Sequence, residues 1–86
     1  MENVIDVDFH VIWPSPVYIR IGSGMRERIG GPDAALSALL HRWPTGNNSE
    51  YLAAKRHCMN AVSRHGSPAL ARSAFVEAAA AAKVLA

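Results

Sequence analysis

The first residues of the chain alternate between apolar and polar side chains. Asp6, Asp8 and His10 separate the apolar positions, so the pattern has a period of two. This period, with β-branched and aromatic residues, is typical of a strand rather than of a frayed chain end. The strand ends before Pro14 and Pro16, because proline cannot donate to a sheet ladder. Its apolar side is made of Ile5, Val7, Phe9, Val11 and Trp13.

A β-hairpin is predicted next, from residues 17–21 and 25–29, which flank the loop Gly22-Ser23-Gly24. A three-residue loop sets Ile21 opposite Met25, so that apolar side chains share one face. A two-residue loop would mix the two faces, because a shift of one residue inverts every side chain. The inner face is then Val17, Ile19, Ile21, Met25 and Ile29. The outer face is Tyr18, Arg20, Arg26 and Arg28.

One residue breaks the inner face of the predicted hairpin. Glu27 points towards the core, where an unpaired carboxylate is costly. An inward charge on an edge strand also discourages pairing with other chains. Arg42 and Arg72, each one helix away, are the expected partners, so we interpret Glu27 as structural.

Three helices are predicted after the hairpin, and the last of them runs to the end of the chain. Pro32 and Pro68 suit a first helical position, where their missing N–H costs nothing. Asn48 or Ser49 can cap the middle helix. The expected apolar stripes are Leu36, Leu39, Leu40 and Trp43, then Tyr51, Ala54, Cys58, Ala61 and Val62, then Ala71, Ala74, Phe75, Ala78, Ala79 and Ala82.

The order of the elements predicts an α+β fold, in which a two- or three-stranded antiparallel sheet is followed by three helices packed on one face. Residues 1–12 form an N-terminal arm or an extra strand, and residues 13–86 form a single domain. The predicted core sets the first helix and the third against the hairpin. Its members are Leu36, Leu39, Leu40, Trp43 and Phe75 against Val17, Ile19 and Ile21.

Five ordered motifs are similar to those of one known family. They read WPSPV at 13–17, GPDAAL at 31–36, WP at 43–44, YxxAxxxC at 51–58 and ARxAFxxAA at 71–79. Together they resemble a family of small alphaproteobacterial proteins catalogued as domain of unknown function 982, over about residues 13 to 82. The resemblance implies a stand-alone bacterial domain, and it transfers no activity, cofactor or partner to any residue.

Four histidines and one cysteine raise the question of a metal site. His57 and Cys58 are adjacent on a predicted helix, so they diverge by about 100°, and no H-x-x-x-H or C-x-x-C spacing occurs. We interpret Cys58 as a buried structural thiol. Ser63 and His65 flank a helix end without a carboxylate beside them. We therefore expect no catalytic residue, no metal and no cofactor.

Composition and charge narrow the function classes. The 86 residues are half apolar and form one small core, which is marginally stable as a monomer. With one cysteine, no secretory signal and no apolar stretch that spans a membrane, the chain is expected in the cytoplasm. Residues 1–19 carry three acids and no base, whereas residues 20–86 hold all nine Lys and Arg residues against four acids.

Tyr18, Arg20, Arg26 and Arg28 give the outer hairpin face the residue types that contact phosphate and stack on bases. We favour a solvated face, in which Tyr18 and Arg28 form a cation–π contact or the acidic arm neutralises the arginines.

The sequence thus predicts a non-enzymatic interaction domain with an accessory or regulatory role and an unknown protein partner. Self-association is expected, because strand 5–13 offers an apolar edge that two copies can share about a two-fold axis. The alternatives are a weak nucleic-acid binder that uses the hairpin face and an enzyme of unrecognised type.

Overall fold

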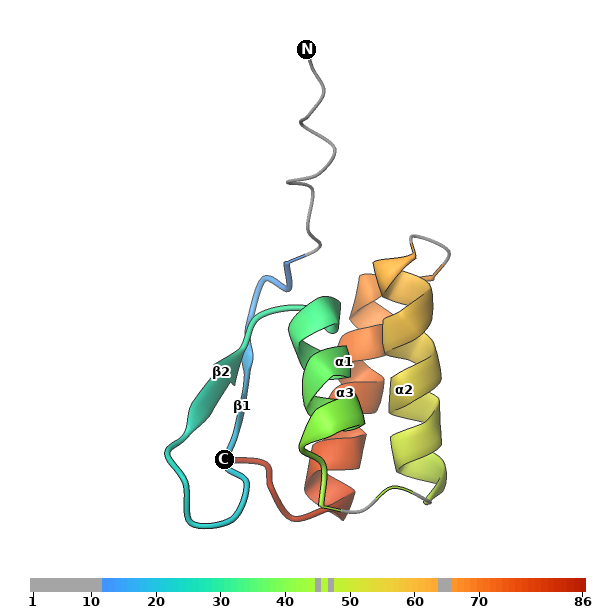
Figure 1. Cartoon of the computed structure of the whole chain (residues 1–86). Coiled ribbons are helices and arrows are strands. Elements are labelled where there is room, and N and C mark those ends of the chain that lie inside the picture. Colours follow the sequence, from blue (N-terminus) through green and yellow to red (C-terminus); the bar gives the residue numbers. More distant parts are fainter. Residues whose placement is uncertain (1–11, 45, 47, 64–65) are drawn as a thin grey trace.

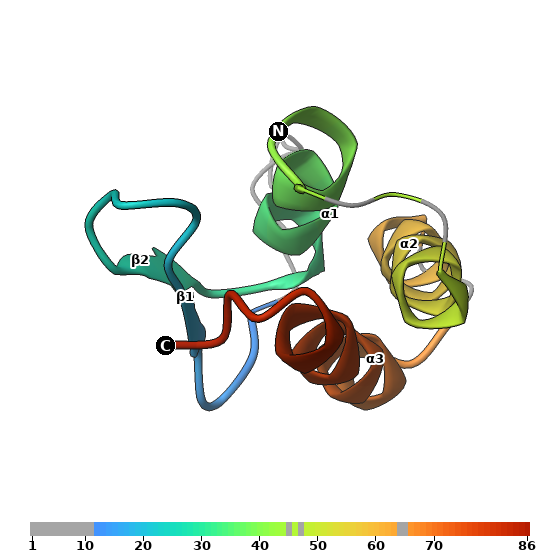
Figure 2. The ribbon, with the colours of Figure 1, turned by 90° about the horizontal axis from the view of Figure 1, so that it is seen from below.

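The computed structural model describes residues 12–44, 46, 48–63 and 66–86. Two strands and three helices follow one another: β1 (Val17–Ile19), β2 (Glu27–Ile29), α1 (Pro32–His41), α2 (Ser49–Val62) and α3 (Pro68–Ala81). The strands form an antiparallel sheet, and the helices pack on one side of it (Figure 1). Seen along the helices, α1 and α3 lie next to the hairpin and α2 lies farthest from it (Figure 2). The predicted α+β class is confirmed.

The predicted register of the hairpin is confirmed, although its strands are shorter than expected. Val17 pairs with Ile29, and Ile19 pairs with Glu27. Gly22 takes the left-handed position of the loop, with φ of 65°. Pairing stops at Glu27, so Met25 leaves the sheet and is 90% exposed. Its assignment to the inner face is therefore wrong.

A third segment pairs with β1, and it comes from the C-terminal part of the chain. The backbone N–H of Arg20 donates to the carbonyl of Val84 at 2.8 Å. The N–H of Ala86 donates to the carbonyl of Tyr18 at 2.9 Å, and Leu85 lies opposite Ile19 in an antiparallel bridge. β1 therefore lies between β2 and residues 84–86.

Helix α3 ends at Ala81, so the expectation that it continues to the end of the chain is wrong. Lys83 adopts a φ of 62°, and its N–H donates to the carbonyl of Ala80. The N–H of Val84 donates to the carbonyl of Ala79. These two bonds form a Schellman motif, which satisfies the last carbonyls of the helix and turns Val84 into the core.

The described N-terminal residues are anchored on the domain through Trp13. Its backbone N–H donates to the carbonyl of Gly30 at 2.8 Å, and its indole Nε1 donates to the carbonyl of Pro68 at 2.9 Å. The ring is buried, with its centroid 6.0 Å from that of Phe75. Arg72 supports the following turn by donating to the carbonyl of Ser15 at 2.8 Å.

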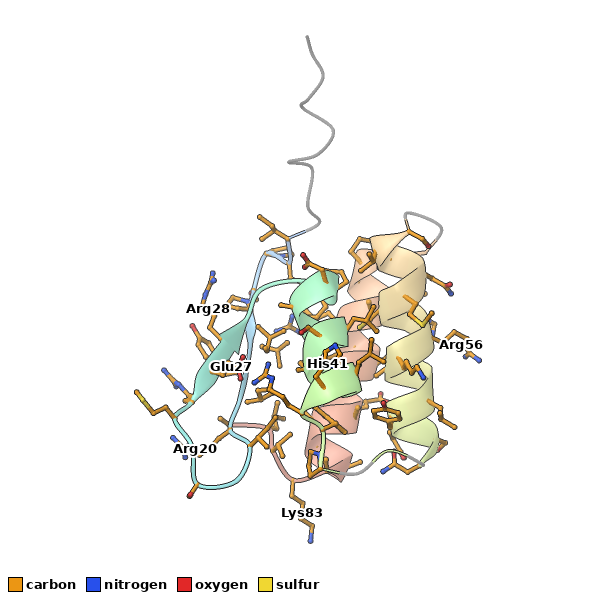
Figure 3. All side chains as sticks on the ribbon, viewed as in Figure 1. Arg20, Glu27, Arg28, His41, Arg56 and Lys83 are labelled. Carbon is orange, nitrogen blue, oxygen red and sulfur yellow. The ribbon has the colours of Figure 1, made fainter. Side chains whose placement is uncertain are left out.

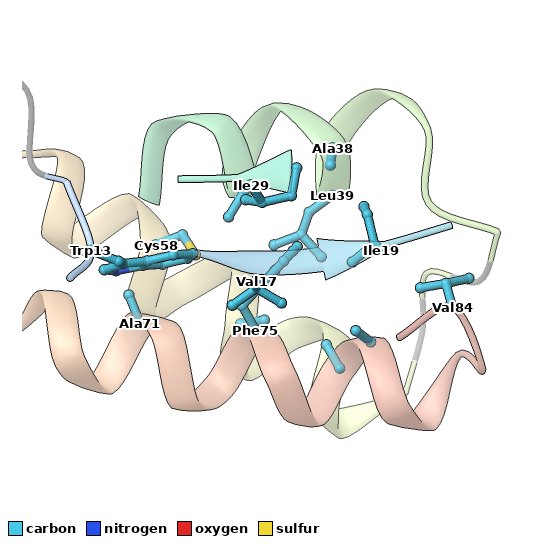
Figure 4. Close-up of a cluster of buried hydrophobic side chains, with 14 of the residues drawn as sticks. Trp13, Val17, Ile19, Ile29, Ala38, Leu39, Cys58, Ala71, Phe75 and Val84 are labelled. Carbon is cyan, nitrogen blue, oxygen red and sulfur yellow. The ribbon is translucent and has the colours of Figure 1, made fainter. Parts of the chain in front are cut away.

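Apolar side chains from β1, β2, all three helices and the C-terminal turn form the core, several of which are shown in Figure 4. On α1 the buried positions are Ala35, Ala38 and Leu39, while Leu36 is half-buried and Leu40 is 48% exposed. Leu40 is therefore wrongly assigned to the core, because it lies about 100° around the helix from Leu39.

The other stripes follow the prediction with smaller departures. Trp43 is half-buried against Phe75, with ring centroids 5.4 Å apart. Val62, the last residue of α2, is exposed instead of buried. Asn48, one of two proposed caps, accepts the backbone N–H of Tyr51 at 2.7 Å. The buried helical positions besides Leu39 and Phe75 are all small, namely Pro32, Ala35, Ala38, Ala54, Cys58, Ala61, Ala71, Ala78 and Ala79.

Candidate functional site: the arginine face of the hairpin

Four residues of the hairpin point away from the helices, and we call them the arginine face: Tyr18, Arg20, Arg26 and Arg28. The three arginines are exposed and Tyr18 is half-buried. Figure 3 shows Arg20 and Arg28 on the side of the hairpin that faces away from α1. The alternation of the sequence predicted this grouping, because successive strand residues point to opposite sides.

Tyr18 carries a cation–π contact, but its partner is Arg26. The Arg26 guanidinium carbon lies 4.4 Å from the centroid of the Tyr18 ring. Arg28 lies directly opposite Tyr18, as the predicted register has it, but the guanidinium over the ring is that of Arg26, so the predicted cation–π partner is wrong. Diagonal neighbours on adjacent strands are within reach of long side chains, which explains how Arg26 covers the ring.

Glu27 points to the other side of the sheet, towards α1, and is paired there. Its carboxylate accepts two hydrogen bonds from the guanidinium of Arg42, at 2.5 and 2.8 Å. Arg42 is thus the partner, whereas Arg72 donates to backbone carbonyls of the Ser15-Pro16 turn. Figure 3 shows Glu27 between β2 and α1, so it does not neutralise the arginine face.

The hydrogen bonds from Arg42 lower the pKa of Glu27, and they raise the pKa of Arg42. A carboxyl whose pKa is depressed on folding stabilises the fold above its unfolded pKa. That contribution is lost as the pH falls through the folded pKa. Both side chains are more than a third exposed, so we expect the pair to contribute less than about 1 kcal/mol.

The arginine face has no acidic partner within the part of the chain that the structure describes. Glu27, on the opposite side of the hairpin, forms its ion pair with Arg42. Arg20 and Arg28 make no side-chain hydrogen bond to a described residue, and Arg26 contacts the Tyr18 ring. Asp6 and Asp8, the acids expected to neutralise this face, lie outside the described residues. Their pairing with the arginines stays a prediction.

The predicted dimer strand is described only at its last residue. Trp13 is buried in the core of its own chain, which removes it from any shared apolar edge. Ile5, Val7, Phe9 and Val11 lie outside the described residues.

Cys58 is buried, as predicted, and burial raises the pKa of its thiol to about 12. A thiol with this pKa is protonated at neutral pH, and the thiolate is the reactive form. Among the described residues, no three histidine, cysteine or acidic side chains lie close enough to hold a metal ion. No helix in the described ranges is sufficiently long and apolar to cross a membrane.

A second surface feature escaped the sequence analysis. Leu52 and Met59 are exposed on α2 and line a shallow hollow of about 280 Å³ with Lys55, Arg56 and Asn60. The signal was present in the sequence, because residues seven apart lie on nearly the same side of a helix.

These features define a small α+β domain with an exposed cationic hairpin. Residues 15–86 match a family described as proteins of unknown function, DUF982, and the chain belongs to that family. The predicted resemblance is therefore confirmed. The chain is also similar to protein Atu1219 of Agrobacterium tumefaciens, whose structure was determined by NMR, with 30% identity and a TM-score of 0.73. The match covers 88% of this chain and 76% of that one. No curated protein matches the chain.

Proposed function

We propose that this chain is a small non-enzymatic interaction domain with an accessory or regulatory role, and that it contacts an acidic protein surface through the arginine face. The observation that carries the proposal is the position of its charges. Three guanidinium groups lie exposed on one side of the hairpin, and no described carboxylate pairs with them. Arginine is enriched at protein interfaces, where its planar fork binds carboxylates with two hydrogen bonds.

We propose a cytoplasmic location for the protein. Its single cysteine is a buried free thiol, which suits a reducing compartment.

Nucleic acid is the second candidate, because the arginine face combines guanidinium groups with an aromatic ring. Bases stack on exposed aromatic faces in single-stranded nucleic-acid sites. Tyr18 is half-buried, and Arg26 covers its ring, so a base would have to displace that guanidinium. Phosphate contacts alone give weak binding that falls steeply with salt. An acidic protein surface therefore fits this face better than a nucleic acid does.

Affinity capture from native cytosol, with and without nuclease treatment, tests the two candidates together. We expect the wild-type chain to retain a protein after nuclease treatment, and the variant with Arg26→Ala and Arg28→Ala to lose it. A variant with Lys83→Ala, which removes an exposed cation outside the arginine face, is the control.

Mobility-shift assays with purified mixed DNA and RNA complete this test. We expect no shift near physiological salt, because three arginines neutralise few phosphates. A clear shift that the double variant abolishes would reverse the order of the two candidates. If the wild type and the double variant captured the same protein equally well, the arginine face would not be the binding surface.

Self-association is the third part of the proposal, and it concerns residues 5–11. Their alternating pattern supports pairing of two copies about a two-fold axis, because a two-fold contact uses the same surface twice. The small core is a further reason for two copies to share surface.

Light scattering at micromolar concentration, on the intact chain and on a version that begins at Ile12, checks the dimer. We expect a dimer for the intact chain and a monomer for the shortened one. Monomers in both samples would refute the dimer. Dimers in both would exclude residues 5–11 from the interface.

A further inference from the structure

Helix α2 is apolar on two opposite sides. Ala54, Cys58 and Ala61 are buried against the other helices. Leu52 and Met59 lie about 20° apart around the helix axis and roughly opposite Ala61. They are 52% and 49% exposed. The outward side of a surface helix is normally polar, so two large apolar residues there need an explanation.

The two exposed residues belong to one hollow, which we call the α2 groove: Leu52, Lys55, Arg56, Met59 and Asn60. It has a volume of about 280 Å³. Leu52 and Met59 are separated by roughly 10 Å along the helix. Lys55 and Arg56 lie between them in the sequence, on either side of the line that joins them. Figure 3 shows Arg56 projecting outward from α2.

The cations of the α2 groove have no acidic partner among the described residues. Neither Lys55 nor Arg56 forms an ion pair there. The acidic residue of α2 is Glu50, in its first turn, whereas the groove lies further along the helix. The groove thus presents two apolar contacts and two positive charges without any charge of the opposite sign.

This arrangement disfavours a second copy of the chain as the occupant. If two α2 helices packed antiparallel with Leu52 against Met59, the Lys55 side chains of the two copies would meet on one side of the interface and the Arg56 side chains on the other. Like charges that face each other across an interface cost several kcal/mol. A different protein with acidic residues avoids this repulsion.

We propose that the α2 groove binds an acidic amphipathic helix of another protein. Such a helix presents two apolar side chains, two turns apart, to Leu52 and Met59, and carboxylates to Lys55 and Arg56. Helices commonly bind grooves through apolar anchors at this spacing. Methionine adapts its shape to different partners, and opposite charges select among them. The site is separate from the arginine face, which lies at the other end of the molecule (Figure 2).

The test uses the full chain, labelled with ¹⁵N, and two synthetic helical peptides. Both peptides carry leucines two turns apart. One has glutamates between and beside them, and the other has lysines at the same positions. We expect the glutamate peptide to shift the amide signals of α2 around Leu52 to Asn60, and the lysine peptide to leave them unchanged.

Variants then assign the binding to the groove. We expect L52A combined with M59A to weaken binding of the glutamate peptide at least tenfold, which is about 1.4 kcal/mol. K55E combined with R56E should transfer the preference to the lysine peptide. Leu70→Ala is the matched control, because Leu70 is an equally exposed leucine on α3, and it should leave binding unchanged. The five substituted residues are exposed or half-buried, and thermal melts verify that each variant folds.

Three results would overturn the proposal. The first is equal binding of both peptides, or no shift in α2 with either. The second is a shift confined to the arginine face, abolished by Arg26→Ala with Arg28→Ala. The third is a shift of α2 signals with protein concentration alone, which would assign the groove to a second copy. Loss of capture by the arginine-face variant has no bearing on this groove, so the two proposals fail independently.

Discussion

Replacing Phe75 with alanine is expected to remove about 3–5 kcal/mol of folding free energy, the usual effect of truncating a buried aromatic side chain. Phe75 is fully buried and lies between the rings of Trp13 and Trp43. Its loss leaves a cavity at the point where the N-terminal turn, α1 and α3 meet. A domain this small has little stability in reserve. We therefore expect Phe75→Ala to be largely unfolded at 25 °C, as measured by far-UV circular dichroism during urea titration.

Leu40→Ala is the matched control for this experiment. Leu40 is apolar and belongs to the leucine-rich helix α1, but it is half-exposed. Its truncation removes little buried apolar surface, so we expect the folding free energy to fall by less than about 1 kcal/mol. If Leu40→Ala destabilised the domain as much as Phe75→Ala does, the orientation of α1 would be wrong.

The second large effect is expected from Trp13→Ala, which should lower the free energy of unfolding by about 3–5 kcal/mol. The indole ring packs on Phe75, and its Nε1 binds the carbonyl of Pro68 at the start of α3. Trp13→Ala therefore removes apolar contacts and leaves that carbonyl without its indole donor. Trp13→Phe retains most of the contact but loses the hydrogen bond, so we expect an intermediate loss of about 1–2 kcal/mol.

Urea titration followed by circular dichroism measures both Trp13 variants, because this signal does not depend on the tryptophan that is removed. Ile12→Ala is the control, since Ile12 is the preceding residue and is exposed. If Trp13→Ala unfolded at the same urea concentration as the wild type, residues 12–16 would not pack on α3. Equal losses for Trp13→Ala and Ile12→Ala would show that the indole ring has no special role.

The hairpin was predictable because each of its positions indicates a side of the sheet. The apolar residues Val17, Ile19 and Ile29 allow one register, and the structure has it. Met25 fits the same pattern and yet is exposed. Alternation assigns a residue to one face of a sheet only while the residue is part of a strand. Nothing in the side chains of residues 20–26 indicates that pairing stops at Glu27.

The helices show a different limit of the sequence pattern. In α1, Leu36, Leu39 and Leu40 dominate the apolar pattern, but the core lies on the side of Ala35, Ala38 and Leu39, and Leu40 is exposed. Alanine occurs on both buried and exposed surfaces, so it does not reveal which side other helices will cover. The side of α1 that is buried depends on how α1 packs against the other elements, which its own sequence does not specify.

The alternating pattern of the strands predicted which residues form the arginine face, but it did not predict the cation–π contact between Arg26 and Tyr18. Opposite pairs are fixed by the register, but Arg26 reaches Tyr18 diagonally through a long side chain. The α2 groove was not predicted because one buried stripe is enough to explain a helix, and Leu52 and Met59 form a second apolar line on its other side. Pairing of Leu85 with Ile19 had no local signal, because the partners are far apart in the sequence and Lys83 is not the glycine expected at such a turn.

The pairing of residues 84–86 with β1 has a consequence for the order of folding. β1 meets β2 across a short loop, whereas its bridge to Leu85 closes a loop that contains most of the chain. Closing a longer loop costs more entropy, and a two-stranded hairpin alone is marginally stable. We therefore expect residues 84–86 to dock after the rate-limiting step of folding, once α3 has packed. Contacts formed after that step slow unfolding and leave the folding rate unchanged, so we expect loss of this pairing to shorten the lifetime of the native state.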